Sequence, residues 1–369
     1  MIGIVLVLVA VAAVMVGRGD LRIPGLSAGF ASTRTVHAVI GSEKATFFDD
    51  PRVQEELARH GYEVDYLAAG SRRIATDVNL AEYDFAFPSS APAGAKIASE
   101  NANLGSYTPF HSPMALATFT PILSILAEQG VAREENGHWF IDIERYMELS
   151  GEGVRWRDLS EEYPSPRNVQ ISSTDVRTSN SAAMYLSVLA WTANGGQVPG
   201  PGDVDRVADI IRPLFAGQGY TESSSAGPFS DYLSQGMGSK PMVMVYEAQF
   251  VGELLAPDSR IREEMVLAYP DPTVLSEHTV IALSEDGVAV AELLQNDPEL
   301  QQLAAQHGYR PNNPALFDEV FLAEGRSAPP NFLATVDPPA YEQLESLIEN
   351  VGSQYAGTPM PPEEEVEQQ

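Results

Sequence analysis

Four loops rich in serine, threonine and arginine each follow a stretch of sequence that is typical of a β-strand. They span residues 41–44, 69–72, 88–90 and 172–181. In open α/β sheets, ligands bind in the crevice outside the carboxyl ends of the strands, where hydroxyl groups and the free N–H groups of a helix N-terminus can hold a polar group. One such loop alone is better explained as a helix N-cap, because Ser, Thr and Asp are preferred cap residues. Four such loops, one of them with several hydroxyls in succession, predict a ligand-binding crevice.

Motifs for catalysis or metal binding are absent from the sequence. It contains no G-x-x-x-x-G-K-[ST], no G-x-S-x-G, no H-E-x-x-H and no acidic calcium loop. Its six histidines are scattered without the spacing of metal ligands. We therefore expect no catalytic residues, no metal site and no cofactor. An acid–base pair assembled from distant residues would leave no local motif, so a hydrolase or transferase stays open as an alternative.

The composition of the chain limits the kinds of molecule that the protein can bind. The chain has 369 residues with 22 basic and 51 acidic side chains, a formal net charge of -29. Nucleic acid would be repelled by such a surface, because affinity for it comes from neutralising phosphates. Cysteine is absent, which excludes disulfides, zinc–thiolate sites and a lipid anchor on an N-terminal cysteine.

The N-terminus carries an uninterrupted apolar run, residues 1–16, followed by a Gly-, Ser- and Arg-rich stretch, residues 17–34. A helix of that apolar run would be about 24 Å long, a little shorter than a hydrocarbon core of about 30 Å. No basic residue precedes the run, and no clear small-x-small cleavage site follows it. We predict a membrane anchor over residues 1–16 and a tether over residues 17–34, with a cleaved signal as the alternative. Both readings place the rest of the chain outside the cytoplasm.

The remaining sequence has the pattern of two α/β units. A strand at 36–40, a helix over 51–60 and a strand at 62–67 form a βαβ unit, which implies a parallel, doubly wound sheet. A second unit begins with a predicted strand at 168–172 and a helix over 181–193. Further predicted elements are a helix near 230–235, a strand at 240–246 and a last helix over 341–349.

Two candidate crossover strands, 113–118 and 265–269, separate these units and predict a discontinuous first lobe. The expected organisation is lobe 1 from 35–112 and 269–345, lobe 2 from 113–268, and an acidic disordered tail over 346–369.

Several segments resemble the type 2 periplasmic binding proteins. GSEKATFFDDPRVQEELARHGYEVDYLAAGSRRIA resembles the first βαβ unit of that family, and VQISSTDVRTSNSAAMYLSVLA resembles the second-lobe strand, anion-binding loop and helix of its molybdate/sulfate-type members. SDYLSQGMGSKPMVMVYEAQF, VLAYPDPTVLSEHTVIALSEDG and LLQNDPELQQLAAQHGYRP are similar to later segments of the same family. The resemblance covers roughly residues 36–312 and implies two lobes that close on a ligand. No ligand signature of the family is complete.

The resemblance also implies which residues bind the ligand. Lobe 1 is expected to contribute Ser42, Lys44, Ser71, Arg72, Ser89 and Ser90. Lobe 2 is expected to contribute Thr174, Asp175, Arg177, Ser179, Asn180, Ser181, Tyr246 and Glu247. Each arginine is explained equally well by pairing with a surface carboxylate, and Tyr246 by a place in the core.

The function that we expect is that of an extracytoplasmic solute-binding protein, not an enzyme, which delivers a small polar solute to an ABC permease. Lys44, Arg72 and Arg177 favour an anionic ligand, while Glu43, Asp175 and Glu247 could receive a cationic group. The alternatives are an envelope sensor or adaptor that uses the same fold for a protein partner, and the hydrolase or transferase above.

Overall fold

The computed structural model of the chain describes residues 33–216, 222, 224–331 and 333–353. The predicted membrane anchor, residues 1–16, lies outside this part of the chain, as does all of the predicted tether except Thr33 and Arg34. Among the described residues, no helix is both long enough and apolar enough to cross a membrane.

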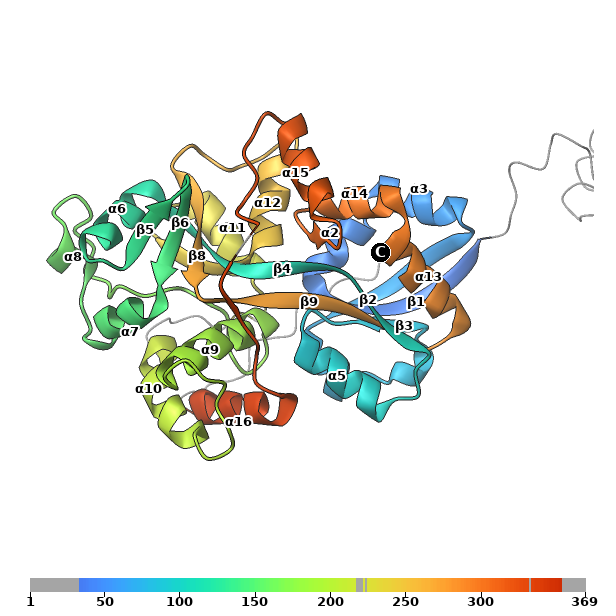
Figure 1. The fold of residues 1–369 in the computed structure, drawn as a ribbon, viewed down its shortest axis with the longest axis horizontal. Helices are drawn as coiled ribbons and strands as arrows, with labels where there is room; N and C mark the ends of the chain where they lie inside the picture. The colour runs from blue at the N-terminus through green and yellow to red at the C-terminus, as the bar shows by residue number, and fades with distance from the viewer. Residues whose placement is uncertain (1–32, 217–221, 223, 332, 354–369) are drawn as a thin grey trace, which may run out of the picture.

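The first lobe is built on a sheet whose first three strands are parallel. β1 (Arg34–Gly41) lies between β2 (Tyr62–Ala69) and β3 (Phe85–Phe87), and β9 (Thr273–Ala282) extends the sheet antiparallel to β3. Helices cover both faces of this sheet (Figure 1). They are α2 (Ala45–Phe48), α3 (Pro51–Arg59), α4 (Ser71–Thr76), α5 (Ala91–Glu100), α13 (Glu285–Asn296) and α14 (Pro298–Gln306). We call these elements lobe 1.

Local sequence explains how the first βαβ unit forms. Asp50 caps α3 by accepting a hydrogen bond from the N–H of Arg52, and Pro51 occupies the first helical position, where its missing N–H costs nothing. Gly61, with φ of +87°, lies just beyond the helix and turns the chain into β2, a conformation that other residues rarely adopt. The helix and both strands predicted for this region are confirmed.

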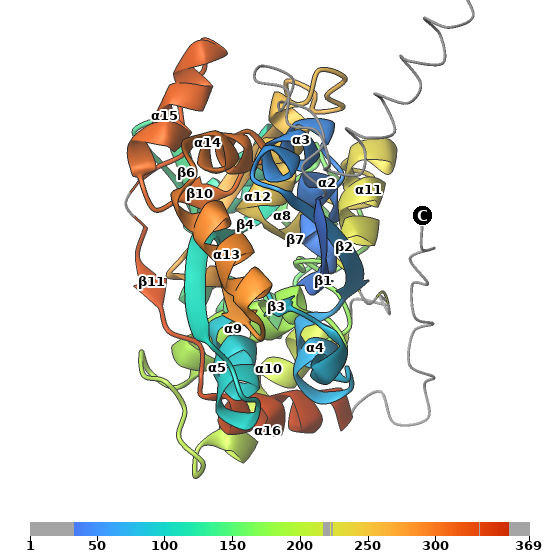
Figure 2. The same cartoon turned by 90° about the vertical axis from the view of Figure 1, so that its right-hand side faces the viewer.

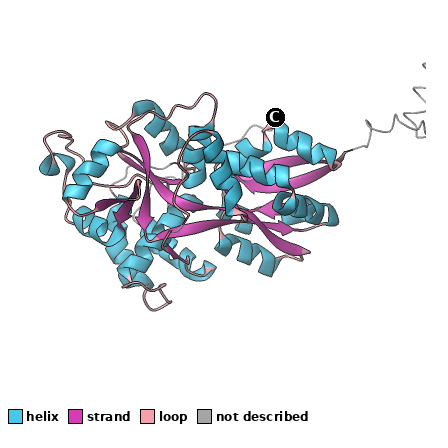
Figure 3. Ribbon diagram, turned by 45° about the horizontal axis from the view of Figure 1, so that its top comes forward, coloured by secondary structure: helices cyan, strands magenta, loops and turns pink. Residues whose placement is uncertain are grey.

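One long strand connects the two halves of the molecule. β4 (Gly105–Phe119) pairs with β9 through its first part and with β7 (Met242–Tyr246) and β8 (Met265–Asp271) through its last part. β8 and β9, separated only by Pro272, carry the chain back in the opposite direction. Figure 3 shows these strands running through the middle of the molecule with helices on either side. Both predicted crossover strands are therefore present.

The second lobe surrounds β7, β8 and the hairpin of β5 (Ala132–Glu135) and β6 (His138–Asp142). Its central helix, α9 (Asn180–Ala193), is buried along its first eleven residues and lies within the largest apolar core of the chain. The other helices of this half, which we call lobe 2, are α6 (Thr120–Glu128), α7 (Ile143–Gly151), α8 (Trp156–Leu159), α10 (Val204–Ala216), α11 (Ala226–Gln235) and α12 (Glu247–Leu255).

The segment predicted as a strand at 168–172 forms only single bridges, and this prediction is wrong. Ser172 exchanges both ladder hydrogen bonds with β7, donating from its N–H to Met242 O and accepting from Met244 N–H. The neighbouring N–H of Ile171 instead donates to Tyr146 Oη at 3.0 Å.

The end of the chain differs from expectation in two ways. After β10 (Arg310–Pro311), α15 (Pro314–Ala323) and β11 (Thr335–Val336), α16 runs over Tyr341–Gly352, so the helix continues into the predicted tail. α16 also leaves lobe 1 and packs against α10, with Leu344, Leu347 and Ile348 in the core of lobe 2 (Figures 1 and 2). Its apolar stripe explains both corrections, since a helix with such a stripe must bury it. Residues 354–369 lie outside the described part of the chain.

Candidate ligand-binding site between the lobes

Side chains from both lobes meet where the strands of lobe 1 end. Ser71, the first residue of α4, accepts a hydrogen bond from Ser89 N–H at 2.8 Å, which joins the loops after β2 and β3. Asn180, the first residue of α9 in lobe 2, donates from Nδ2 to Ser89 O at 3.2 Å and to Tyr246 Oη at 2.9 Å. Asn180 therefore bridges the loop after β3 of lobe 1 and the end of β7 of lobe 2.

Lys44 contacts Ser89, one of the residues of this bridge, and is fully buried. Its Nζ is 2.5 Å from Glu43 Oε1, 2.7 Å from Ser89 Oγ and 3.1 Å from His278 Nδ1, and it lies 4.7 Å from the centre of the Phe87 ring. Burial lowers the pKa of Lys44, because desolvation disfavours the ammonium, and Glu43 partly opposes that effect. Ser89 Oγ also donates to the same Glu43 carboxylate.

Two polar residues of β9 complete this arrangement. Ser276 Oγ donates to Ser89 O, and His278 Nδ1 lies 3.1 Å from Lys44 Nζ and 3.5 Å from Glu43 Oε1. His278 Nε2 is a buried atom with no hydrogen-bond partner among the described residues. Burial and the neighbouring Lys44 lower the pKa of His278, so its imidazole is neutral.

We call the connected set of polar residues the interlobe cluster. Its members are Glu43, Lys44, Ser71, Ser89, Asn180, Tyr246, Ser276 and His278. Five of these residues are predicted from the sequence. The signal for Ser276 and His278 was the alternation of β9, in which both occupy buried positions on the same face as Val274 and Val280 while Glu277 is exposed. Burial raises the pKa of Tyr246, so its hydroxyl stays a neutral hydrogen-bonding group.

The hydroxyls before α9 form a group of their own next to this cluster. Ser181 Oγ is 3.1 Å from Thr174 Oγ1 and 2.9 Å from Ser179 Oγ, and all three side chains are buried. Ser179 is the N-cap residue, but its side chain makes no capping hydrogen bond. Ser42, which starts the turn after β1, and the buried Ser90, the N-cap residue of α5, lie at the corresponding strand ends of lobe 1.

Both predicted site arginines are paired with carboxylates. Arg177 forms an ion pair with the fully buried Asp175, with Nη2 and Oδ2 2.6 Å apart. Arg72 reaches across the lobes, where its Nε donates to Glu345 Oε1 of α16 at 2.7 Å and its Nη1 donates to Arg177 O. Arg177 is mostly buried in this pair, with only 18% of its side chain exposed.

Glu247 lies apart from the interlobe cluster and pairs with Arg310 instead. Arg310 donates to its two carboxylate oxygens, from Nε at 2.5 Å and from Nη2 at 2.7 Å, and Tyr269 Oη donates to Oε1 at 2.5 Å. These three donors occupy a carboxylate that is fully buried. Glu247 is thus held in a structural ion pair.

Comparison with known proteins identifies the fold. No protein-family model matches the sequence, and neither does any curated protein. Among solved structures, iron-bound HitA from Pseudomonas aeruginosa is 14% identical with a TM-score of 0.55, covering 86% of this chain and 99% of that one. An ABC-transporter solute-binding protein from Thermotoga lettingae bound with α-D-tagatose is 12% identical with a TM-score of 0.57, covering 89% and 96%.

A third similar structure is the substrate-binding protein of an ABC transporter from Agrobacterium tumefaciens, 14% identical with a TM-score of 0.54, covering 90% of this chain and 97% of that one. Identities this low establish the fold alone. Nearly the whole length of each of these proteins is matched, which confirms the resemblance seen in the sequence. The chain has the two-lobed α/β fold of the type 2 periplasmic binding proteins.

Proposed function

We propose that this protein is an extracytoplasmic solute-binding protein that closes its two lobes on a small polar solute and presents it to an ABC permease. The observation that carries the proposal is the bridge made by Asn180, which joins Ser89 of lobe 1 to Tyr246 of lobe 2. In an open conformation Asn180 and Ser89 lose each other as hydrogen-bond partners, and a solute with hydroxyl or amide groups can bind both. Contacts from both lobes then favour the closed state, as a hinge equilibrium requires.

The pairing of the cations supports one class of solute over another. Lys44, Arg72 and Arg177 were the reason to expect an anion, and each has a carboxylate of this chain within ion-pair distance. A bound anion would compete with those carboxylates. We therefore propose an uncharged or zwitterionic solute, bound by hydroxyl and amide groups, with His278 Nε2 as a further hydrogen-bonding atom.

The cellular location of the protein follows from the same proposal. The permease meets its binding protein outside the cytoplasm, which agrees with the apolar run at residues 1–16. We propose that this run either anchors the protein in the membrane or serves as its export signal. Washing membranes with carbonate separates the two, because only a retained anchor stays with the lipid.

A thermal-shift screen of the purified full chain tests the function. Sugars, amino acids, osmolytes and oxyanions are compared, and a solute at a hundred times its Kd should stabilise the protein by about 2.7 kcal/mol. That corresponds to a rise of several degrees, at about 2–4 °C per kcal/mol. We expect the rise with a sugar, an osmolyte or an amino acid, whereas a rise with oxyanions alone would contradict the proposed solute class.

Tyr246→Phe tests whether the solute binds at the interlobe cluster. The variant loses one hydroxyl, so the unliganded protein should lose about 0.5–1.5 kcal/mol of stability while most of the solute-induced rise disappears. Tyr163→Phe is the matched control, since Tyr163 Oη also makes one hydrogen bond, to Met237 O at 2.8 Å, within lobe 2. If no solute raises the melting temperature, the adaptor function replaces this proposal. An equal solute-induced rise in both variants would place the site elsewhere.

A further inference from the structure

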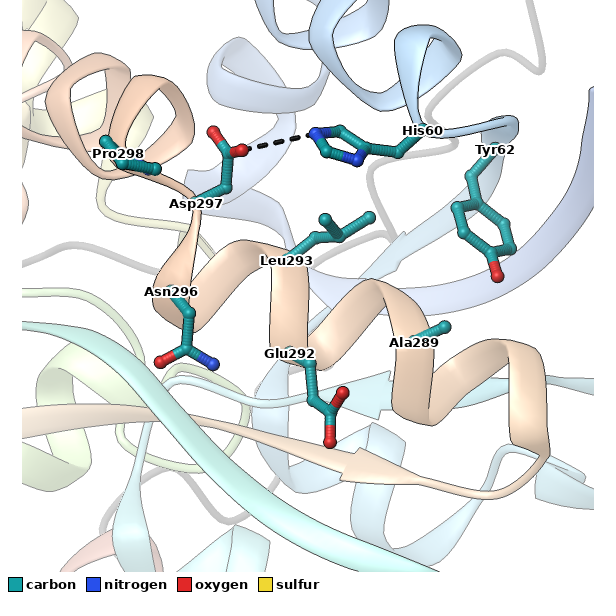
Figure 4. A pocket seen from close by; sticks show the side chains of 8 residues that line it. All are labelled: His60, Tyr62, Ala289, Glu292, Leu293, Asn296, Asp297 and Pro298. Atoms are coloured by element: carbon teal, nitrogen blue, oxygen red, sulfur yellow. Dashed lines mark hydrogen bonds and ion pairs between the residues drawn. The ribbon is translucent and has the colours of Figure 1, made fainter.

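A histidine and two carboxylates converge on the surface of lobe 1, in a group that shares no residue with the interlobe cluster. His60 follows the last turn of α3, Glu56 lies one turn earlier on the same helix, and Asp297 joins α13 to α14. His60 Nε2 is 3.4 Å from Glu56 Oε1 and 3.2 Å from Asp297 Oδ2, and the three atoms lie within 4.8 Å of one another. Figure 4 shows His60 directed at Asp297 across the gap between the two helical segments.

One oxygen of each carboxylate is held by other contacts, which fixes the direction of the second oxygen. Asp297 Oδ1 caps α14 by accepting from the N–H groups of Glu299 and Leu300, both at 3.0 Å. Glu56 Oε2 accepts from Arg59 Nη1 at 2.5 Å. The oxygens left over, Asp297 Oδ2 and Glu56 Oε1, both face His60 Nε2. The side chains of Glu56 and Asp297 are only 9% and 12% exposed, so neighbouring atoms restrict their movement.

The spacing of these atoms suits a tetrahedral metal ion. Zn²⁺ binds histidine nitrogen and carboxylate oxygen at about 2.0–2.2 Å, which places neighbouring ligand atoms of a tetrahedron about 3.3 Å apart. The distances of 3.4 Å and 3.2 Å from His60 Nε2 to the two carboxylate oxygens are close to that separation. A pocket of about 480 Å³ borders His60 and Asp297 and offers room for water as the remaining ligand (Figure 4).

We propose that Glu56, His60 and Asp297 form a binding site for a divalent transition-metal ion, with Zn²⁺ as the ion that fits best. A neutral imidazole with two carboxylates prefers Zn²⁺ to Mg²⁺, which requires six oxygen ligands in octahedral geometry. The net charge of -29 raises the local concentration of cations around the chain. A bound ion would link α3 to the junction of α13 and α14, two segments that are far apart in the sequence.

The competing explanation is that a proton on His60 holds the same two carboxylates by ion pairing alone. The two explanations differ in their response to added metal. A metal site should raise the melting temperature when Zn²⁺ is added, because an ion that binds only the folded chain stabilises it. An ion pair without metal would show no dependence on Zn²⁺.

The experiment is a titration of the untagged, chelator-treated full chain with Zn²⁺ in the presence of excess Mg²⁺, followed by calorimetry and by the melting temperature. We expect one strongly bound Zn²⁺ per chain. Asp297→Asn should lower the affinity at least tenfold while keeping the cap of α14, because asparagine caps helices as well as aspartate does. His60→Gln should lower it similarly.

His37→Gln is the matched control, because His37 is an exposed histidine that faces a single carboxylate, Asp65, at 3.2 Å. Its Zn²⁺ affinity should equal that of the unaltered chain. The proposal is overturned if the unaltered chain binds no Zn²⁺, or if Asp297→Asn and His60→Gln bind it as tightly as His37→Gln does. The solute-induced rise in melting temperature should persist in Asp297→Asn, so the outcome is independent of the proposed solute site.

Discussion

Replacing Glu247 by glutamine should destabilise the protein strongly without touching the solute site. The carboxylate accepts two hydrogen bonds from Arg310 and one from Tyr269, and it is fully buried. Glutamine keeps the shape but removes the charge, and it leaves the buried Arg310 guanidinium without a counter-ion. Removing one partner of a buried ion pair costs about 3–5 kcal/mol, because the remaining charge stays desolvated. At about 2–4 °C per kcal/mol, the melting temperature should fall by about 6–20 °C.

Calorimetry and urea unfolding followed by circular dichroism measure this loss of stability. Arg260→Gln is the matched control, because it breaks the ion pair between Arg260 and Glu253. Glu253 lies on the same helix as Glu247, but the side chain of Arg260 is 57% exposed. An exposed pair contributes about 0–1 kcal/mol. A double variant, Glu247→Gln with Arg310→Met, should recover part of the lost stability, since no buried charge then remains unpaired.

The reasoning is refuted if Glu247→Gln lowers the free energy of unfolding no more than Arg260→Gln does. A different outcome would assign Glu247 to the solute site after all. In that case the variant keeps its unliganded melting temperature and loses the solute-induced rise. The two roles therefore give opposite patterns in the same pair of measurements.

Two further predictions follow from buried charges. Arg177→Ala should lower the stability of the unliganded protein by about 1–3 kcal/mol, measured by urea unfolding, because it leaves the buried carboxylate of Asp175 without its ion pair. An unchanged stability would contradict a structural role for this pair. Burial, aided by Arg310, lowers the pKa of His111 to about 4, below the value of about 6.5 in an unfolded chain. The unfolded state therefore takes up the proton first, so stability should fall as the pH drops from about 6.5 to about 4. His111→Gln should reduce that fall and His37→Gln should not, and equal slopes would contradict the assignment.

Short-range signals predicted much of the fold. Helix α3 begins at an Asp-Pro pair and ends before Gly61, so its caps and its hydrophobic face can be read within one stretch of sequence. The two crossover segments were visible as apolar runs between βα units. These features depend on neighbours within a few residues, which is why residue patterns and the family resemblance were sufficient for them.

The sequence by itself also determined that polar loops follow the strands. It predicted that Ser71, Ser89, Asn180 and Tyr246 contribute to a binding site at the ends of these strands. Only the tertiary structure decided which charges remain available to a ligand. Arg72 finds Glu345 on a helix that packs on the other lobe, and Glu247 finds Arg310 sixty-three residues later in the chain. His60 meets Asp297 across a separation of 237 residues. The pairing of a charged side chain depends on the packing of whole elements, and no local pattern of residues carries that information.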